Sequence, residues 1–217
     1  MRLDLSIYLV TDSAQARRHG RNLVETVREA VAGGVTAVQV REKHAEAHDV
    51  LQLVEVLTDQ LPAHVSLLVN DRIDIFQVAR SRGARVAGVH VGQRDLPVED
   101  VRELVGPEAV IGLTANTASE LVAAETSAAR IDYVGIGAVR ATTSKPDAPS
   151  AIGIAGVARL ARGCSLPAVA IGGIVPDDLA PLRSAGLAGA AVVSWVCASS
   201  DPRLSATALA RAWRAAA

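Results

Sequence analysis

The strongest constraint on the fold is a repeat in which a short apolar segment is followed by a helical pattern. The apolar segments are rich in Val, Ile, Leu and Ala, which is typical of strands buried on both faces. We predict eight strands, over residues 7–11, 37–41, 66–70, 88–91, 110–114, 133–137, 168–171 and 189–193. We predict eight helices, over residues 22–32, 45–60, 73–81, 98–105, 118–127, 154–161, 176–185 and 202–216. Strict alternation with short joints indicates a parallel sheet covered by helices.

Glycine at several helix-to-strand joints supports this pattern. Gly33, Gly83 and Gly186 each follow a last helical turn, where glycine accepts the left-handed conformation that ends a helix. Eight units without a linker predict one α/β domain over residues 1–217, a single (β/α)8 TIM barrel. An open doubly wound sheet is the alternative, but no Gly-x-Gly dinucleotide motif follows the first predicted strand.

Composition narrows the partners of this chain. Half of the 217 residues are hydrophobic but only 2% are aromatic, so the core must consist of aliphatic side chains. The formal net charge of −1 suggests neither nucleic acid nor an anionic membrane as a partner. Cys164 and Cys197 have no metal-type spacing, and we expect them to be buried thiols in a reducing compartment. Without a signal sequence or a membrane-spanning stretch, a cytoplasmic location is expected, and a homo-oligomer is compatible with the sequence.

Polar residues gather where predicted strands end. Gln39, Arg41 and Lys43 alternate along one segment, so a strand turns all three to one side. Asp71 and Asp95 follow two neighbouring strands, and either alone could be an ordinary helix cap. Together they resemble Mg²⁺ ligands, because Mg²⁺ takes one or two carboxylates and fills its remaining positions with water and phosphate oxygens. This constellation predicts a site for a Mg²⁺-bound diphosphate.

Two further segments predict a second phosphate site on the same rim. The longest loop, residues 138–153, places hydroxyls before Lys145 and could close over a bound phosphate. Gly172-Gly173 and Ser194 follow the seventh and eighth strands, where many barrels bind phosphate through backbone N–H groups. His90 is expected to be a hydrogen-bonded scaffold residue, and no Ser-His-Asp or Cys-His constellation is evident. Two anion sites on one rim fit a two-substrate reaction that expels pyrophosphate.

Five motifs together resemble the thiamine phosphate synthase family. In chain order they are QVREK at 39–43, NDR at 70–72, GVHVGQRD at 88–95, DYVGIG at 132–137 and IGGI at 171–174. The similarity covers nearly the whole chain. The resemblance implies a (β/α)8 barrel transferase that uses Mg²⁺ to join hydroxymethylpyrimidine diphosphate to a thiazole phosphate, releasing pyrophosphate.

The resemblance also implies roles for individual residues. Asp71 and Asp95 would bind Mg²⁺, while Arg41, Lys43 and Lys145 would be catalytic. Contacts to the pyrimidine diphosphate would come from Gln39, Val40, Arg41, Glu42, Lys43, Asn70, Thr114 and Lys145. Contacts to the thiazole phosphate would come from Thr142, Thr143, Ser144, Gly173, Val193 and Ser194.

The chain departs from the family in the long loop. The usual Gly-Pro-x-Phe/Tyr-Pro-Thr reads here as GAVRAT at 137–142, so Arg140 replaces an aromatic residue and both prolines are absent. Loss of the prolines predicts a less rigid loop. The alternatives are a thiazole tautomerase, whose catalytic His would lie near Asn116, and a non-catalytic phosphate-binding barrel. Neither of these alternatives would release pyrophosphate.

Overall fold

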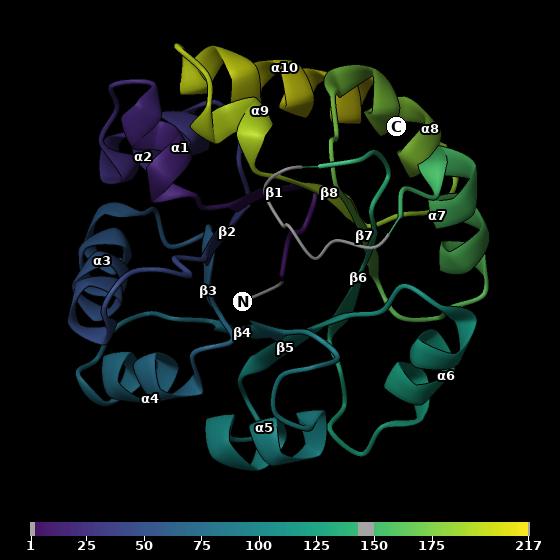
Figure 1. Cartoon of the computed structure of the whole chain (residues 1–217), viewed down its shortest axis with the longest axis horizontal. Helices are drawn as coiled ribbons and strands as arrows, with labels where there is room; N and C mark the ends of the chain where they lie inside the picture. The colour runs from purple at the N-terminus through teal and green to yellow at the C-terminus, as the bar shows by residue number, and fades with distance from the viewer. Residues whose placement is uncertain (1–2, 143–149, 217) are drawn as a thin grey trace.

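Eight parallel strands close into a barrel with helices around its outside (Figure 1). The computed structural model describes residues 3–142 and 150–216. Each strand pairs with the next along the chain, and β8 pairs with β1 to close the ring. The strands are β1 (Ile7–Val10), β2 (Ala37–Val40), β3 (Ser66–Asn70), β4 (Gly88–Val91), β5 (Val110–Thr114), β6 (Tyr133–Gly137), β7 (Ala168–Ile171) and β8 (Gly189–Val192). The predicted (β/α)8 barrel is confirmed, with every strand within one residue of its expected bounds.

The helices follow the strands along the chain and surround the barrel (Figure 1). They are α1 (Ser13–Arg18), α2 (Leu23–Ala32), α3 (Ala47–Gln60), α4 (Ile73–Ser81), α5 (Val98–Val105), α6 (Ala118–Thr126), α7 (Gly153–Arg162), the 3-10 helix η1 (Pro176–Asp178), α8 (Leu179–Ser184), α9 (Ser194–Cys197) and α10 (Pro202–Ala215). Sequence reasoning missed α1 and α9, and it merged η1 with α8 into one helix. In the described ranges, no helix is both long and apolar enough to cross a bilayer.

Local sequence explains where the principal helices begin. Asn22 and Asp201 accept backbone N–H groups at the starts of α2 and α10. Thr117 and Glu120 form a reciprocal capping box at the start of α6. The last helix, α10, contacts α2 and α8 and so closes the helical ring near the seam between β1 and β8 (Figure 1).

Alternation along the strands divides the core into two layers. On β1, Ile7 and Leu9 face the helices, whereas Tyr8 and Val10 face the barrel interior. The interior cluster is small and consists of Leu5, Tyr8, Val10, Ala37, Leu68, Tyr133, Val169 and Ala191. Gly112 makes room for one of the two interior rings, because a Cβ there would lie 2.1 Å from the Tyr133 ring. The interior is thus filled at its middle and left open toward the carboxyl ends of the strands.

Candidate functional site

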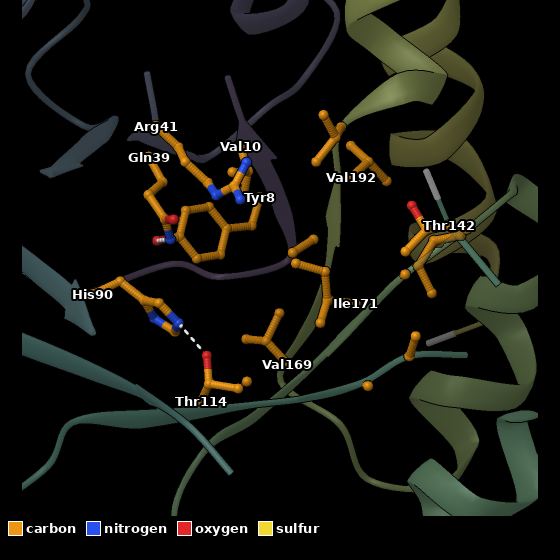
Figure 2. Close-up of a pocket in the computed structure, with 18 of the residues that line it drawn as sticks. Tyr8, Val10, Gln39, Arg41, His90, Thr114, Thr142, Val169, Ile171 and Val192 are labelled. Carbon is orange, nitrogen blue, oxygen red and sulfur yellow. Dashed lines mark hydrogen bonds between the residues drawn. The ribbon is translucent and has the colours of Figure 1, made fainter. Parts of the chain in front are cut away.

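A cavity opens at the carboxyl ends of the strands, where barrel enzymes place their chemistry (Figure 2). Its floor includes the inward-facing residues Tyr8, Gln39 and Tyr133. Its rim comes from the last residues of strands and from the loops that follow them, including Arg41, Asn70, Thr114, Thr142, Gly172, Gly173, Val193 and Ser194. Eight of the residues expected from the sequence therefore line one cavity, counting Gln39 with Arg41, Asn70, Thr114, Thr142, Gly173, Val193 and Ser194.

A chain of hydrogen bonds crosses the cavity floor. The Gln39 amide nitrogen donates to the Tyr8 hydroxyl at 2.8 Å, and the Tyr8 and Tyr133 hydroxyls lie 2.8 Å apart. His90 joins this chain through Nδ1, which lies 2.9 Å from the Tyr133 hydroxyl. Its Nε2 lies 3.0 Å from Thr114 Oγ1 (Figure 2). His90 is therefore hydrogen-bonded, as the sequence predicted, and it also lines the cavity.

The direction of this chain depends on which group donates at each step. Tyr8 accepts from Gln39, and donation from Tyr8 to Tyr133 would satisfy the Tyr8 hydrogen. If Tyr133 then donates to Nδ1, the His90 ring carries its hydrogen on Nε2 and donates it to Thr114. In that order the Thr114 hydroxyl hydrogen is available to an acceptor in the cavity. Thr114 and Gln39 both line the cavity.

Burial of the two tyrosines predicts an unusual alkaline titration. Burial raises the pKa of Tyr8 to about 12 and that of Tyr133 well above its ordinary value of 10.0. These are the only tyrosines in the chain. A raised folded pKa means that the associated stability is intact below about pH 10 and is lost as pH rises toward 12. Tyrosinate absorbance should therefore appear only together with loss of folded circular dichroism, and ordinary tyrosine titration in the folded protein would contradict the buried pair.

Two carboxylates approach each other beyond β3 and β4. Burial and the nearby charge of Asp95 raise the pKa of Asp71 to about 6, whereas Lys43 acts in the opposite direction. Asp71 has a positive φ of 58°, and its backbone N–H donates to the carbonyl of His90 on the neighbouring strand. Asp95 accepts the Gly92 N–H at 2.6 Å. The loop backbone thus holds the two acids together, and a cation between them would relieve their repulsion.

Arg41 projects into the cavity from the end of β2 (Figure 2). Its backbone N–H donates to Thr11 at 2.9 Å. One terminal guanidinium nitrogen is buried and has no hydrogen-bond partner within the described residues. A buried guanidinium N–H without an acceptor is costly, so an anion in the cavity would satisfy it.

Three predicted binding residues do not line the cavity. Val40 faces the outer core and Lys43 is solvent-exposed near Asp71. The Glu42 carboxylate accepts from the Thr11 hydroxyl at 2.8 Å and from the Ser13 N–H at 3.3 Å, which ties two loops together. A substrate contact from Val40 would therefore have to come from its backbone. Thr143, Ser144 and Lys145 lie outside the described residues.

A glycine turn after β7 forms the opposite side of the cavity. Gly172 and Gly173 have positive φ values of 99° and 64°, a conformation that L side chains rarely adopt. Beside this turn, β8 pairs with β7 and leads through Val193 into α9, which begins at Ser194. In many barrels this junction, with its short extra helix, binds phosphate.

The structure adds residues that sequence reasoning missed. Tyr8 and Tyr133 form the cavity floor, and their rarity in so aromatic-poor a chain was the available signal. Asn116 accepts the N–H of Gly137 at 2.9 Å and so fixes the exit of β6. Among residues 3–142 and 150–216, no group of three or more His, Cys, Asp or Glu side chains could hold a metal ion.

Comparisons with known proteins agree on one family. Residues 7–196 match a family model described as thiamine monophosphate synthase. The chain is 42% identical to the thiamine-phosphate synthase of Corynebacterium efficiens over 201 residues, which is 92% of this chain and 90% of that protein. It is 44% identical to the thiamine-phosphate synthase of Azorhizobium caulinodans over 199 residues, which is 91% of this chain and 90% of that protein. A thiamine phosphate pyrophosphorylase from Pyrococcus furiosus superposes with a TM-score of 0.83 at 31% identity, covering 99% and 98% of the two chains.

Proposed function

Because the chain belongs to the thiamine monophosphate synthase family, we propose that it joins hydroxymethylpyrimidine diphosphate to a thiazole phosphate, giving thiamine phosphate and pyrophosphate. It is then a transferase of thiamine biosynthesis. The site supports this proposal through one arrangement. Arg41 follows β2, the neighbour of β3, while the glycine turn and Ser194 follow the neighbouring strands β7 and β8, and all of them line one cavity. Two phosphorylated substrates can therefore meet over a shared floor.

Mg²⁺ is proposed as the cofactor, with Asp71 and Asp95 holding it. The arrangement of these acids fits a cation, since burial of Asp71 and the nearby charge of Asp95 raise the pKa of Asp71 to about 6. Two carboxylates are also a typical protein share of a Mg²⁺ site, the remainder being water and phosphate oxygens. Bound Mg²⁺ would supply positive charge to the diphosphate leaving group.

The chemistry requires charge stabilisation more than proton transfer. The bond between the pyrimidine methylene carbon and the diphosphate oxygen breaks, and its electron pair leaves with the diphosphate. The electron-rich aminopyrimidine stabilises the developing cation, and the thiazole nitrogen forms the new bond with its own lone pair. No protein base is needed. Arg41 and Lys43 would counter the growing negative charge, together with Lys145, whose role rests on the sequence alone.

The pyrimidine would lie on the polar floor. Thr114 offers a hydroxyl there, and Gln39 offers an amide that is hydrogen-bonded to Tyr8. Thiazole phosphate would lie across the cavity, between the glycine turn and the β8–α9 junction. Asn116 occupies the position where a tautomerase would need a catalytic His, and its side chain is engaged with Gly137. This favours the synthase over the tautomerase.

Pyrophosphate release tests the proposed function. The purified chain should release pyrophosphate with Mg²⁺ and both substrates present, and omission of the thiazole phosphate should abolish formation of thiamine phosphate. A tautomerase would change the thiazole substrate without releasing pyrophosphate, and a non-catalytic barrel would bind phosphate without turnover. Either of these two results would reject the synthase.

Thr114 should control binding of the pyrimidine substrate. Thr114→Val keeps the shape but removes the hydroxyl, and with it the contacts of that hydroxyl to His90 Nε2 and to the substrate. The KM for the pyrimidine diphosphate should rise roughly 10-fold to 100-fold, since an unsatisfied buried polar group costs about 1–3 kcal/mol. Thr114→Ser retains the hydroxyl and is the matched control. Steady-state kinetics with each substrate varied in turn would measure this, and equal KM values for the two variants would remove Thr114 from the pyrimidine site.

A further inference from the structure

Arg140, which replaces the family's usual aromatic residue, links two loops at the cavity rim. It lies shortly after β6, and both ends of its guanidinium bond the carboxylate of Asp178, with an Nη2–Oδ1 distance of 2.6 Å. The same guanidinium donates to the Gly173 carbonyl at 3.0 Å. Arg140 does not line the cavity. Its side chain therefore binds the outer side of the glycine turn, whose inner side faces the substrates.

Asp178 is built into the fold as the anchor of this contact. The residue is 2% exposed, and its carboxylate also accepts the Val175 N–H at 2.9 Å. Burial alone would raise its pKa, but the hydrogen bonds from Arg140 and Val175 hold the pKa below its ordinary value. A buried carboxylate that stays charged needs its partners, so the pair holds both loops in register.

The backbone of residues 139 and 140 is also hydrogen-bonded to the segment at the end of β7 and the start of the glycine turn. The Val139 N–H donates to the Ile171 carbonyl, and the Arg140 N–H donates to the Gly172 carbonyl, each at 2.9 Å. A Cβ at Gly173 would lie 2.8 Å from the Cβ of Arg140, so the two segments are in close contact. The described start of the loop is thus anchored rather than loosened by the loss of the prolines.

The geometry of the peptide bond determines where the N–H groups of the glycine turn point. In a trans peptide the C=O and the following N–H point in opposite directions. Because the carbonyls of Gly172 and Gly173 point toward Arg140, the N–H groups of Gly173 and Ile174 point away from it. Gly172, Gly173 and Ile174 all line the cavity. Within the described residues, neither the Gly173 N–H nor the Ile174 N–H has a hydrogen-bond acceptor.

We propose that Arg140 and Asp178 are a positioning pair that holds the glycine turn with two backbone N–H groups aimed at the phosphate of the thiazole substrate. Asp178 neutralises the Arg140 charge, so the pair acts through the turn and not by contacting phosphate. This inference rests on the proposed function, because it assigns the thiazole phosphate to this side of the cavity. It adds residues that contact neither substrate.

Kinetics of an Arg140 variant tests the pair. Arg140→Gln should raise the KM for the thiazole phosphate roughly 10-fold or more, the usual size for loss of charge-assisted hydrogen bonds. The KM for the pyrimidine diphosphate and the kcat at saturation should change less than about threefold, because the turn does not hold the leaving group. Arg162→Gln removes an exposed arginine of α7 and is the matched control. Equal KM changes for both substrates, or none, would overturn the proposal.

A second variant separates positioning from folding. Arg140→Gln alone leaves Asp178 buried without its partner and should lower the thermal unfolding temperature. The double variant Arg140→Gln/Asp178→Asn removes both charges, and part of that stability should return. The thiazole-specific KM should stay raised in the double variant. If KM recovered together with stability, the pair would be only structural and the proposal would fail.

Direct binding keeps this test distinct from the proposed function. Isothermal titration with thiazole phosphate, in the presence of pyrophosphate and Mg²⁺, should give a dissociation constant raised in Arg140→Gln and unchanged in Arg162→Gln. A wild-type chain that formed no thiamine phosphate but showed this binding pattern would reject the proposed function and retain the positioning pair. Equal dissociation constants for the wild type and Arg140→Gln would reject the pair even if the wild type formed thiamine phosphate.

Discussion

Asp71→Asn and Asp95→Asn should each lower kcat/KM by roughly 100-fold or more, because a metal-held charge is worth several kcal/mol to the departing diphosphate. The two carboxylates lie beyond the ends of neighbouring strands, where burial and the nearby charge of Asp95 raise the pKa of Asp71 to about 6. Neutralising either one removes half of the negative charge that would hold Mg²⁺. The loss should be largest at limiting Mg²⁺ and smaller when Mg²⁺ is in excess.

The measurement is a Mg²⁺ titration of the initial rate for each variant. Asp100→Asn is the matched control, since this acid lies exposed on α5, away from the cavity. A chelator should abolish activity, and added Mg²⁺ should restore it. Parental rates in both Asp71→Asn and Asp95→Asn at limiting Mg²⁺ would show that these acids do not hold the metal.

Arg41→Met should reduce kcat as well as affinity for the pyrimidine diphosphate. Arg41 lines the cavity, and one of its buried terminal nitrogens has no hydrogen-bond partner in the described part of the chain. Negative charge on the leaving group grows as the bond breaks, so the lost interaction is stronger in the transition state than in the ground state. A loss of roughly 100-fold in kcat/KM corresponds to about 3 kcal/mol, which is typical of an electrostatic contact of this kind.

Steady-state kinetics with each substrate varied separately would check this effect. Arg41→Lys keeps the charge but not the planar guanidinium, and it should show an intermediate loss. Arg28→Met, on the exposed face of α2, is the control for removal of a positive charge. If Arg41→Met changed only the KM for the thiazole phosphate, Arg41 would belong to the thiazole half of the site, and its assignment to the diphosphate would be wrong.

The barrel could be predicted because each strand is a nearly continuous apolar run. A parallel strand covered by helices is buried on both faces, so the runs mark its bounds to within one residue. The helices α1 and α9 were missed for the opposite reason. Only Gln15 and Ala16 of α1 are buried, and α9 has four residues, so neither shows a helical apolar pattern.

Site residues could be predicted from the sequence where they lie at the ends of strands. Gln39, Arg41 and Thr114 lie at strand ends, so the fold alone brings them to one rim. The tyrosine pair was not predictable, since Tyr8 and Tyr133 meet only through the register of a closed barrel, 125 residues apart in sequence. The contact between Arg140 and Asp178 likewise joins residues 38 apart in sequence. From the sequence alone, Arg140 was notable only because it replaces the family's usual aromatic residue.

The most direct test follows the phosphorus atoms of both substrates in one reaction. Phosphorus-31 NMR of the purified chain with Mg²⁺, the pyrimidine diphosphate and the thiazole phosphate resolves the diphosphate, pyrophosphate and phosphomonoester signals. We expect pyrophosphate and thiamine phosphate to appear in equal amounts and at equal rates, with Asp71→Asn slowing both together. Pyrophosphate without thiamine phosphate, or no change in either substrate, would contradict the proposed reaction.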